Sequence, residues 1–175
     1  KLGGIDSIDV IPDRIEAGTF LIAVAATGGK VKLNNVEPKH MESVISLLRK
    51  SNIDIFEEKD SIIVTSNGLD IKACDMETHE YPGFPTDLQA QWMILMSLAS
   101  GSSTIKENIY FDRFTHILEL NRLGCDVHLK DGCAAIKGGR SLVGANVMST
   151  DIRASAALII AALCAKGSTS ISRVY

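Results

Sequence analysis

The residues with the clearest chemical potential stand where an apolar segment begins, in the stretch Phe84–Trp92. Thr86 and Gln89 have the spacing of a capping box, which predicts Thr86 as a helix N-cap and places Asp87 on the first helical residue. A carboxylate at the tip of a rigid helix can accept a proton from a bound substrate. Alternatively, Asp87 only complements the positive end of the helix dipole. The pattern alone leaves both interpretations open.

Two other apolar segments begin with charged residues. When the three segments are aligned, Arg14, Asp87 and Asp151 occupy equivalent first-turn positions. If the helices run in the same direction, their N-termini converge and combine free backbone N–H groups with charged side chains. Such an end of the molecule suits an anionic substrate that carries phosphate or carboxylate. Arg153 is then a candidate anion ligand or an exposed helix arginine, and His116 is interpreted as an ordinary histidine of an amphipathic helix.

The elements that position these residues recur in a fixed order: a buried helix, a strand, an amphipathic helix and further strands. Asp13 and Glu16 offer a second capping pattern before the first buried helix. Repetition of such a unit implies stacked copies with one shared core. Three buried helices surrounded by three sheets would hide their apolar surfaces.

The boundaries of these elements follow from periodicity and from turn residues. Buried helices are predicted for 15–26, for the segment from Thr86 to Gly101 and for the segment from Asp151 to Gly167. Amphipathic helices are predicted around 41–48 and for a segment that contains Phe114, Ile117 and Leu118 and ends at Gly124. Strands are predicted at 30–33, 54–56, 61–65, 70–74, 103–107, 126–129, 133–136 and 170–174, and a short strand or connector at 7–11.

Composition bounds the class of protein. The chain has 175 residues, of which 46% are hydrophobic and 22% charged, so it can bury a sizeable core. A net charge of −3 argues against a general nucleic-acid or membrane-surface binder. The four cysteines form no C-x-x-C pair, and the four histidines are scattered, so neither a metal site nor a disulfide framework is indicated. The longest apolar run, 154–165, is too short to span a bilayer. A cytoplasmic location is expected.

The ends of the sequence suggest an incomplete protein. The chain starts at Lys1 without a methionine, and Tyr175 falls within a predicted strand. We therefore expect the chain to be a fragment of a longer protein.

Several blocks of the sequence resemble one enzyme family. The main blocks are Ile11–Phe20, Phe84–Gln91 and Ser149–Ser155, and the linking pieces Phe111–Phe114 and Ser172–Tyr175 also match. The blocks occur in the expected order and cover essentially the whole chain. The sequence thus resembles the UDP-N-acetylglucosamine enolpyruvyl transferases (1-carboxyvinyltransferases) of bacterial peptidoglycan synthesis.

This resemblance implies an α+β (mixed α/β) fold, the enolpyruvyl-transferase-like inside-out α/β barrel (α/β prism) built from repeated β-α-β-α-β-β units. Residues 1–10 would form an interdomain connector. Residues 11–175 would form part of the second domain, with repeat units at 11–75 and 76–140 and an incomplete unit at 141–175. The implied partner is the missing first domain of the same enzyme.

The implied reaction moves the enolpyruvyl group of phosphoenolpyruvate to the 3-hydroxyl of UDP-N-acetylglucosamine and releases phosphate, without cofactor or metal. By motif, Asp87 matches the catalytic aspartate that contacts this hydroxyl and is implicated in its deprotonation. Ile109 matches a position that contacts the nucleotide. Arg153 matches an arginine near the phosphate or carboxylate of phosphoenolpyruvate, with Asp151 as its neighbour. Arg113 is a further substrate-binding candidate or, alternatively, an interdomain or structural ion-pair former.

The chain also departs from the family pattern. The reactive loop with its cysteine or aspartate proton donor has no counterpart, so none of the four cysteines inherits that role. We expect the chain alone to lack transferase activity. Two alternatives remain: the related transfer to shikimate 3-phosphate, and a non-catalytic repeat module that binds a ligand or protein. The residues of the Phe84–Asp87 and Ser149–Ser155 blocks favour the branch of the family that acts on the nucleotide sugar.

Overall fold

The computed structural model describes residues 3–4 and 7–174. The helices are α1 (Arg14–Thr27), α2 (Glu42–Lys50), α3 (Gln89–Leu98), α4 (Ile117–Arg122) and α5 (Ile152–Cys164), with 3₁₀ turns η1 (Pro38–Met41) and η2 (Thr86–Leu88). The strands are β1 (Gly29–Asn34), β2 (Asp54–Glu57), β3 (Ser61–Ser66), β4 (Met76–Glu77), β5 (Ser102–Lys106), β6 (Val127–Lys130), β7 (Cys133–Lys137), β8 (Asn146–Met148) and β9 (Ser170–Ser172).

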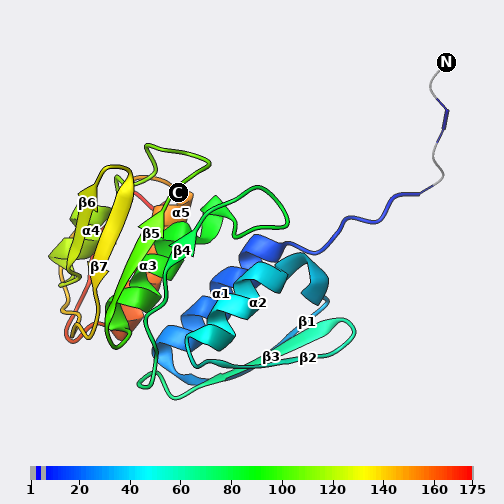
Figure 1. The fold of residues 1–175 in the computed structure, drawn as a ribbon, viewed down its shortest axis with the longest axis horizontal. Helices are drawn as coiled ribbons and strands as arrows, with labels where there is room; N and C mark the ends of the chain where they lie inside the picture. Colours follow the sequence, from blue (N-terminus) through cyan, green and yellow to red (C-terminus); the bar gives the residue numbers. More distant parts are fainter. Residues whose placement is uncertain (1–2, 5–6, 175) are drawn as a thin grey trace.

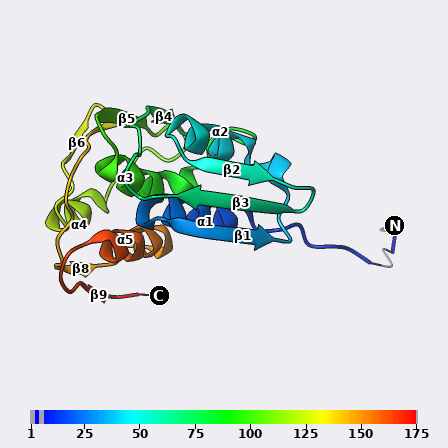
Figure 2. The same ribbon diagram turned by 90° about the horizontal axis from the view of Figure 1, so that it is seen from below.

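Three helices form the centre of the molecule. α1, α3 and α5 contact one another and lie between the sheets (Figure 2). α3 is the most enclosed, because every residue from Gln89 to Ser97 is buried. Trp92 is fully buried, and its ring meets that of Phe84 edge-on at 5.5 Å between centroids. A helix that is apolar on most sides is stable only in such a position, so the expected burial of this segment is confirmed.

The sheets repeat one pattern of pairing. The first has the order β1-β3-β2 and the second β4-β5-β7-β6, so β5, β7 and β6 repeat the order of β1, β3 and β2. The pair β4–β5 is parallel, and so is the third, two-stranded sheet β8–β9. Figure 1 shows the first two sheets on either side of the central helices. The order β4-α3-β5-α4-β6-β7 matches the expected repeat unit, whereas the unit boundaries remain a prediction.

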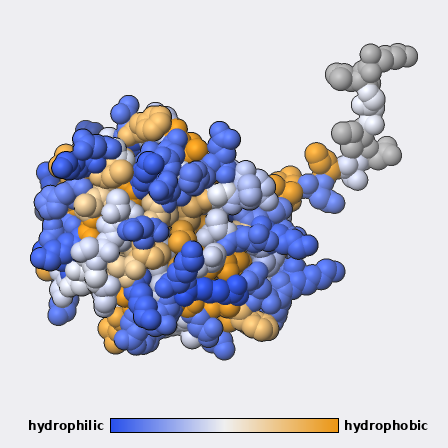
Figure 3. Space-filling model, in the orientation of Figure 1, coloured by the Kyte–Doolittle hydropathy of each residue, from blue (hydrophilic) through white to orange (hydrophobic). Residues whose placement is uncertain are grey.

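The N-terminal segment stands apart from the folded body. Residues 7–11 form neither helix nor strand, which favours the connector over the short strand. Ile8, Val10 and Ile11 are 82%, 92% and 70% exposed, and Figure 3 shows hydrophobic residues along this extended segment. Residues 1–2 and 5–6 of the predicted connector lie outside the described residues. The helix that follows begins as predicted, because Asp13 accepts hydrogen bonds from the amides of Ile15 and Glu16 at 2.8 and 3.1 Å.

The predicted capping box at the start of α3 is wrong. Thr86 belongs to η2, and α3 begins at Gln89 without a side-chain cap. The Thr86 hydroxyl is used elsewhere, since it donates to Glu107 and accepts from Arg113. The side-chain amide of Gln89 likewise donates to Glu107 and to the backbone carbonyl of Arg113, and not to the backbone at the helix start. A tertiary network has therefore displaced the local cap.

Three smaller expectations also need correction. Asp151 is the N-cap of α5 and not a first-turn residue, so it corresponds to Asp13 rather than to Arg14. Leu118 is 74% exposed, and the buried face of α4 is formed by Ile117 and Leu120 instead. The predicted strand at 70–74 contributes only an isolated bridge between Lys72 and Ser100.

Candidate active site

The starts of the three central helices share one hollow, as expected from their alignment. It has a volume of about 400 Å³ and opens between α1, α3 and α5. Asp87 and Gln91 line it from the side of α3, and Arg153 from the side of α5. Its other lining residues are Asp13, Ile15, Glu16, Thr19, Phe20, Ile152 and Ala156. Three carboxylates, one arginine and the starts of three helices therefore line the same space.

Asp87 is bound by two arginines from distant parts of the chain. Nη1 of Arg113 lies 2.9 Å from Asp87 Oδ1, and Nε of Arg153 contacts the same oxygen. The three side chains are partly enclosed, at 33% exposed for Asp87, 16% for Arg113 and 38% for Arg153. Within residues 3–4 and 7–174, Oδ2 of Asp87 has no hydrogen-bond partner. One carboxylate oxygen is thus held by cations while the other is available to a ligand.

Arg113 is the more firmly fixed of the two arginines. It lies in the segment between β5 and α4, and its Nη1 also donates to the hydroxyl of Thr86 at 2.9 Å. Its guanidinium carbon lies 5.0 Å from the centre of the Tyr110 ring, a cation–π contact. These contacts lock a long side chain that would otherwise sample many rotamers. Arg113 thus forms an ion pair within the chain, as the alternative to substrate binding supposed, and its substrate-binding role stays a prediction.

Arg153 is positioned through the cap of its own helix. Oδ1 of Asp151 accepts hydrogen bonds from the backbone amides of Arg153 and Ala154 at 2.8 and 3.0 Å. This cap fixes the first turn of α5 and directs Arg153 towards Asp87. In the part of the chain that the structure describes, Nη1 and Nη2 of Arg153 make no hydrogen bond. They can donate two parallel bonds to a carboxylate or phosphate.

Two other candidates lie outside this ion-pair cluster. Ile109 is 39% exposed, and its backbone amide donates to Glu107 at 2.9 Å in the turn that leads to Arg113. Arg14 stacks on Tyr81 at 5.0 Å and forms no ion pair with Asp87 among the described residues. The structure thus places Ile109 in the same segment as Arg113 but does not bring Arg14 to the carboxylate.

His116 is interpreted above as an ordinary histidine of an amphipathic helix, but it precedes α4 and is buried. It is 1% exposed. Burial lowers the pKa of His116 from 6.5 to about 4; Asp151 opposes this shift and Arg113 reinforces it. The imidazole is therefore uncharged at neutral pH. Its Nε2 has no hydrogen-bond partner among the residues that the structure describes.

Glu107 is a site residue that the sequence reasoning missed. It is 2% exposed, and five donors surround its carboxylate. A signal was present in the alternation of β5. Ser103 and Ile105 are buried, and Glu107 continues their spacing just beyond the strand, so it falls on the buried side. A charged residue in phase with a buried face needs partners, which marks it as part of a polar network.

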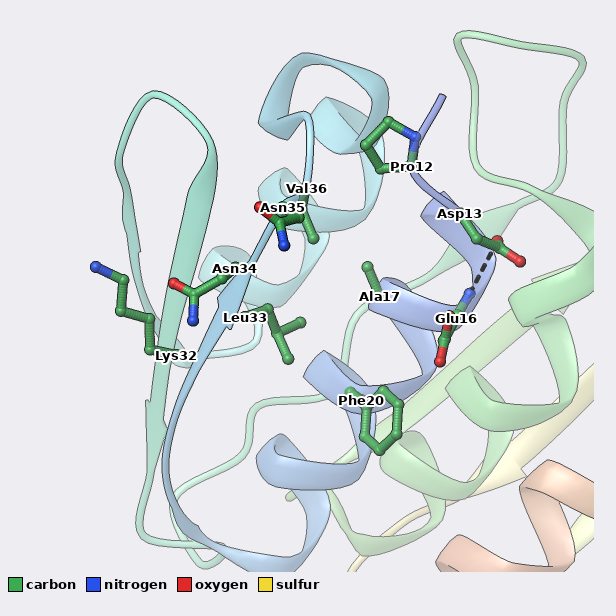
Figure 4. A pocket seen from close by; sticks show the side chains of 10 residues that line it. All are labelled: Pro12, Asp13, Glu16, Ala17, Phe20, Lys32, Leu33, Asn34, Asn35 and Val36. Atoms are coloured by element: carbon green, nitrogen blue, oxygen red, sulfur yellow. Dashed lines mark hydrogen bonds between the residues drawn. The ribbon is translucent and has the colours of Figure 1, made fainter. Parts of the chain in front are cut away.

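The remaining features offer less chemistry. A hollow of about 390 Å³ lies between α1 and β1, where Phe20 and Leu33 face it together with Lys32 (Figure 4). It contains neither Asp87 nor an arginine, so the chemistry favours the hollow at the helix starts. Burial raises the pKa of Cys74, Cys125 and Cys164, the last to about 11, which keeps these thiols protonated.

No group of three or more His, Cys, Asp or Glu side chains among residues 3–4 and 7–174 is arranged to hold a metal ion. In the same residues, no helix has the length and apolar character needed to cross a membrane.

Comparison with known proteins gives consistent matches along the chain. The family model for EPSP synthase (3-phosphoshikimate 1-carboxyvinyltransferase) matches residues 4–175. A UDP-N-acetylglucosamine 1-carboxyvinyltransferase from Aliarcobacter butzleri is 49% identical over 100% of the chain and 42% of the relative. One from Bartonella henselae is 50% identical over 100% of the chain and 41% of the relative. The chain thus spans less than half the length of these relatives.

Solved structures show the same fold at lower identity. The enolpyruvyl transferase NikO from Streptomyces tendae superposes with a TM-score of 0.87 and 22% identity, over 95% of this chain and 40% of that chain. An EPSP synthase from Acinetobacter baumannii superposes with a TM-score of 0.69 and 13% identity, over 94% of this chain and 39% of that chain. At these identities the likeness concerns the fold alone, and it confirms the predicted fold class.

Proposed function

This chain belongs to the EPSP synthase (3-phosphoshikimate 1-carboxyvinyltransferase) family, and on that premise we propose that it forms one domain of a UDP-N-acetylglucosamine 1-carboxyvinyltransferase. The whole enzyme would transfer the enolpyruvyl group of phosphoenolpyruvate to the sugar 3-hydroxyl and release phosphate. A first domain of the same enzyme would close over the helix starts and supply the proton donor. We place this reaction in the cytoplasm, as a step of peptidoglycan precursor synthesis, with no cofactor or metal.

The observation that supports this proposal is that the two oxygens of the Asp87 carboxylate have different surroundings. Oδ1 is held by Arg113 and Arg153, whereas Oδ2 has no partner among the described residues. Oδ2 is therefore able to accept the proton of a sugar hydroxyl and to direct the oxygen towards its target. The oxygen then attacks C2 of phosphoenolpyruvate while C3 gains a proton. The resulting tetrahedral intermediate loses phosphate from C2 and a proton from C3, which restores the double bond of the enolpyruvyl group. Asp87, which lies in η2 just before α3 and not on the first residue of that helix as predicted, serves as base and orienting group.

The arginines and the helix starts supply positive charge for the second substrate. Nη1 and Nη2 of Arg153 have no hydrogen-bond partner among the described residues, and they match the geometry of a carboxylate or phosphate. The N-termini of three helices add backbone dipoles of the same sign. Arg113 and Asp151 then act as substrate-binding residues that also hold Asp87 and Arg153 in place. The half-exposed side chain of Ile109 is proposed to contact the nucleotide.

The choice between sugar acceptors rests on sequence identity and not on fold. The relatives at 49% and 50% identity are named UDP-N-acetylglucosamine 1-carboxyvinyltransferases, whereas the EPSP synthase structure shares only 13% of the sequence. Both branches have similar folds, so the fold cannot separate them. Transfer to shikimate 3-phosphate is accordingly the second candidate, and a non-catalytic binding module is the third.

The test is the variant Asp87→Asn in the longer protein that contains this chain. Loss of a general base typically costs about 10²- to 10⁴-fold in rate, so we expect kcat to fall by that order with the fold unchanged. Phosphate release from phosphoenolpyruvate with UDP-N-acetylglucosamine gives kcat, and circular dichroism checks the fold. Asp54→Asn removes the same charge from an exposed position on β2 and should leave kcat unchanged.

Two results would contradict this proposal. A rate for Asp87→Asn close to that of the unmodified protein would reduce Asp87 to a structural partner of the arginines. Phosphate release with shikimate 3-phosphate, and none with the nucleotide sugar, would establish the second candidate instead.

A further inference from the structure

The carboxylate of Glu107 is surrounded only by donors. Oε1 accepts hydrogen bonds from the hydroxyl of Thr78 at 2.7 Å and from the amides of Ile109 and Tyr110 at 2.9 and 3.0 Å. Oε2 accepts from the hydroxyl of Thr86 at 2.9 Å and from the side-chain amide nitrogen Nε2 of Gln89 at 3.3 Å. An ionised carboxylate is an acceptor at all its lone pairs, so it satisfies this arrangement, whereas a neutral amide would place two donors among donors.

The Thr86 hydroxyl connects this buried carboxylate to the partly buried ion pair of Arg113 and Asp87. Nη1 of Arg113 donates to Thr86 Oγ1 at 2.9 Å, and a guanidinium has no acceptor. Thr86 must therefore accept from Arg113, and its single proton must point to Glu107. The same Nη1 lies 2.9 Å from Asp87 Oδ1. A directed chain of hydrogen bonds thus runs from Glu107 through Thr86 to Arg113 and Asp87.

Glu107 also joins the two segments that carry these residues. Its bonds to Ile109 and Tyr110 fix the turn that follows β5, and its bonds to Thr86 and Gln89 fix η2 and the start of α3. These segments are 18 or more residues apart in the chain. No local cap holds the start of α3, so this buried anion sets its position relative to the turn.

We propose that Glu107 is a positioning residue that holds Arg113 against Asp87 through the hydroxyl of Thr86. The proposal rests on the function inferred above, because it assigns Glu107 to the geometry of that reaction. Glu107 itself is buried and does not touch substrate. It acts by fixing the direction of one hydroxyl proton, and through it the place of the guanidinium that binds Asp87.

The test compares variants of equal size in the longer protein. Thr86→Val removes the connecting hydroxyl, and Glu107→Gln removes the charge that orients it. Because small displacements of reacting groups are costly, we expect each variant to lower kcat by about tenfold or more, with a smaller change in KM. The double variant should be no slower than the slower single variant, because both changes break the same chain. Thr86→Ser keeps a hydroxyl and should retain most of the rate.

Thr78→Val is the matched control. It also removes a threonine hydroxyl from Glu107, but on the Oε1 side, away from Arg113. We expect it to lower the thermal midpoint by as much as Thr86→Val and to leave kcat nearly unchanged. Equal losses of kcat in both valine variants, or additive losses in the double variant, would mean that the network only stabilises the fold and would overturn the proposal.

A readout without turnover separates this inference from the proposed function. In a crystal structure of Thr86→Val, we expect Arg113 to move away from Asp87 while the backbone of α3 stays in place. An unchanged contact between Arg113 and Asp87 would overturn the positioning role, whatever reaction the protein catalyses. If the unmodified protein releases no phosphate but the contact is lost in the variant, the function fails and the positioning role stands.

Discussion

Asp87 lies between two arginines from separate segments, the turn that follows β5 and the start of α5, and this arrangement changes the interpretation of an aspartate close to a helix start. A carboxylate that only complements a helix dipole needs no specific partner. Here Arg113 and Arg153 both bind Oδ1, so the position of Asp87 depends on segments 26 and 66 residues away in the chain. Two long-range contacts that fix one side chain are typical of a functional site. They favour the interpretation of Asp87 as a catalytic residue over its interpretation as a partner of the helix dipole.

His116 gives the molecule a defined response to acid. Its folded pKa of about 4 lies below the ordinary 6.5, so between these values the unfolded chain binds a proton that the folded chain does not. The free energy of unfolding is therefore highest above pH 6.5 and falls as the pH drops towards 4. We expect the unmodified chain to lose on the order of 3 kcal/mol more over this window than His116→Gln does, measured by urea unfolding.

The control for this effect is His128→Gln. The side chain of His128 is 79% exposed, so its replacement should leave the pH dependence of stability as it is in the unmodified chain. Equal pH dependence in the unmodified chain and in His116→Gln would show that His116 does not carry the effect.

At the scale of elements, the close approach of the second sheet to α3 depends on a glycine. A Cβ atom at Gly138 would lie 2.1 Å from the carbonyl oxygen of Ala99 and 2.7 Å from that of Gly101. Backbone oxygens at the end of a buried helix cannot move aside as a flexible side chain can. The segment that follows β7 can therefore pack against the end of α3 only because Gly138 has no side chain.

Gly138→Ala should consequently destabilise the fold more than its neighbour Gly139→Ala. Gly139 has a φ of 71° but open space around its Cβ position, so its replacement costs about 1–2 kcal/mol of backbone strain. For Gly138→Ala we expect about 3 kcal/mol or more from overpacking against the backbone. Chemical denaturation of both variants measures the difference. Equal losses of stability would show that the segment after β7 moves freely away from α3.

In the whole molecule, the three sheets around the central helices differ in size. The first sheet has three strands and the second four, but the third consists of β8 and β9 alone in the described part of the chain. On α5, Ile159 and Leu163 are 44% and 67% exposed, whereas α3 is buried along most of its length. The helix starts likewise face solvent, where the proposed first domain would close the site.

The chain by itself should therefore be folded but inactive. We expect no phosphate release from phosphoenolpyruvate and UDP-N-acetylglucosamine, because the proton-donating loop of the proposed first domain is missing. Calorimetry should show at most weak binding of the nucleotide sugar. The longer protein, assayed in parallel, serves as the positive control. Turnover by the 175-residue chain would contradict both this expectation and the proposed division of the active site.

The sequence by itself determined the elements and their repetition. Periodicity and turn residues are local signals, so the helices, the hairpins and the cap at Asp13 could be predicted from neighbouring residues. The family resemblance added the prediction that Asp87, Arg113 and Arg153 are site residues. None of this required knowledge of which segments meet.

Only the tertiary structure decided how these residues are held. Thr86 has the spacing of a cap, but it contacts Glu107 and Arg113, which lie 21 and 27 residues away. A hydroxyl forms hydrogen bonds with the strongest partners within reach. Here a buried carboxylate and a guanidinium bind the Thr86 hydroxyl more strongly than a local backbone amide would. Glu107 was missed for the same reason, because three of its five donors lie 18 or more residues away in the chain. Long-range contacts between polar groups leave little trace in local patterns, and here they set the geometry of the site.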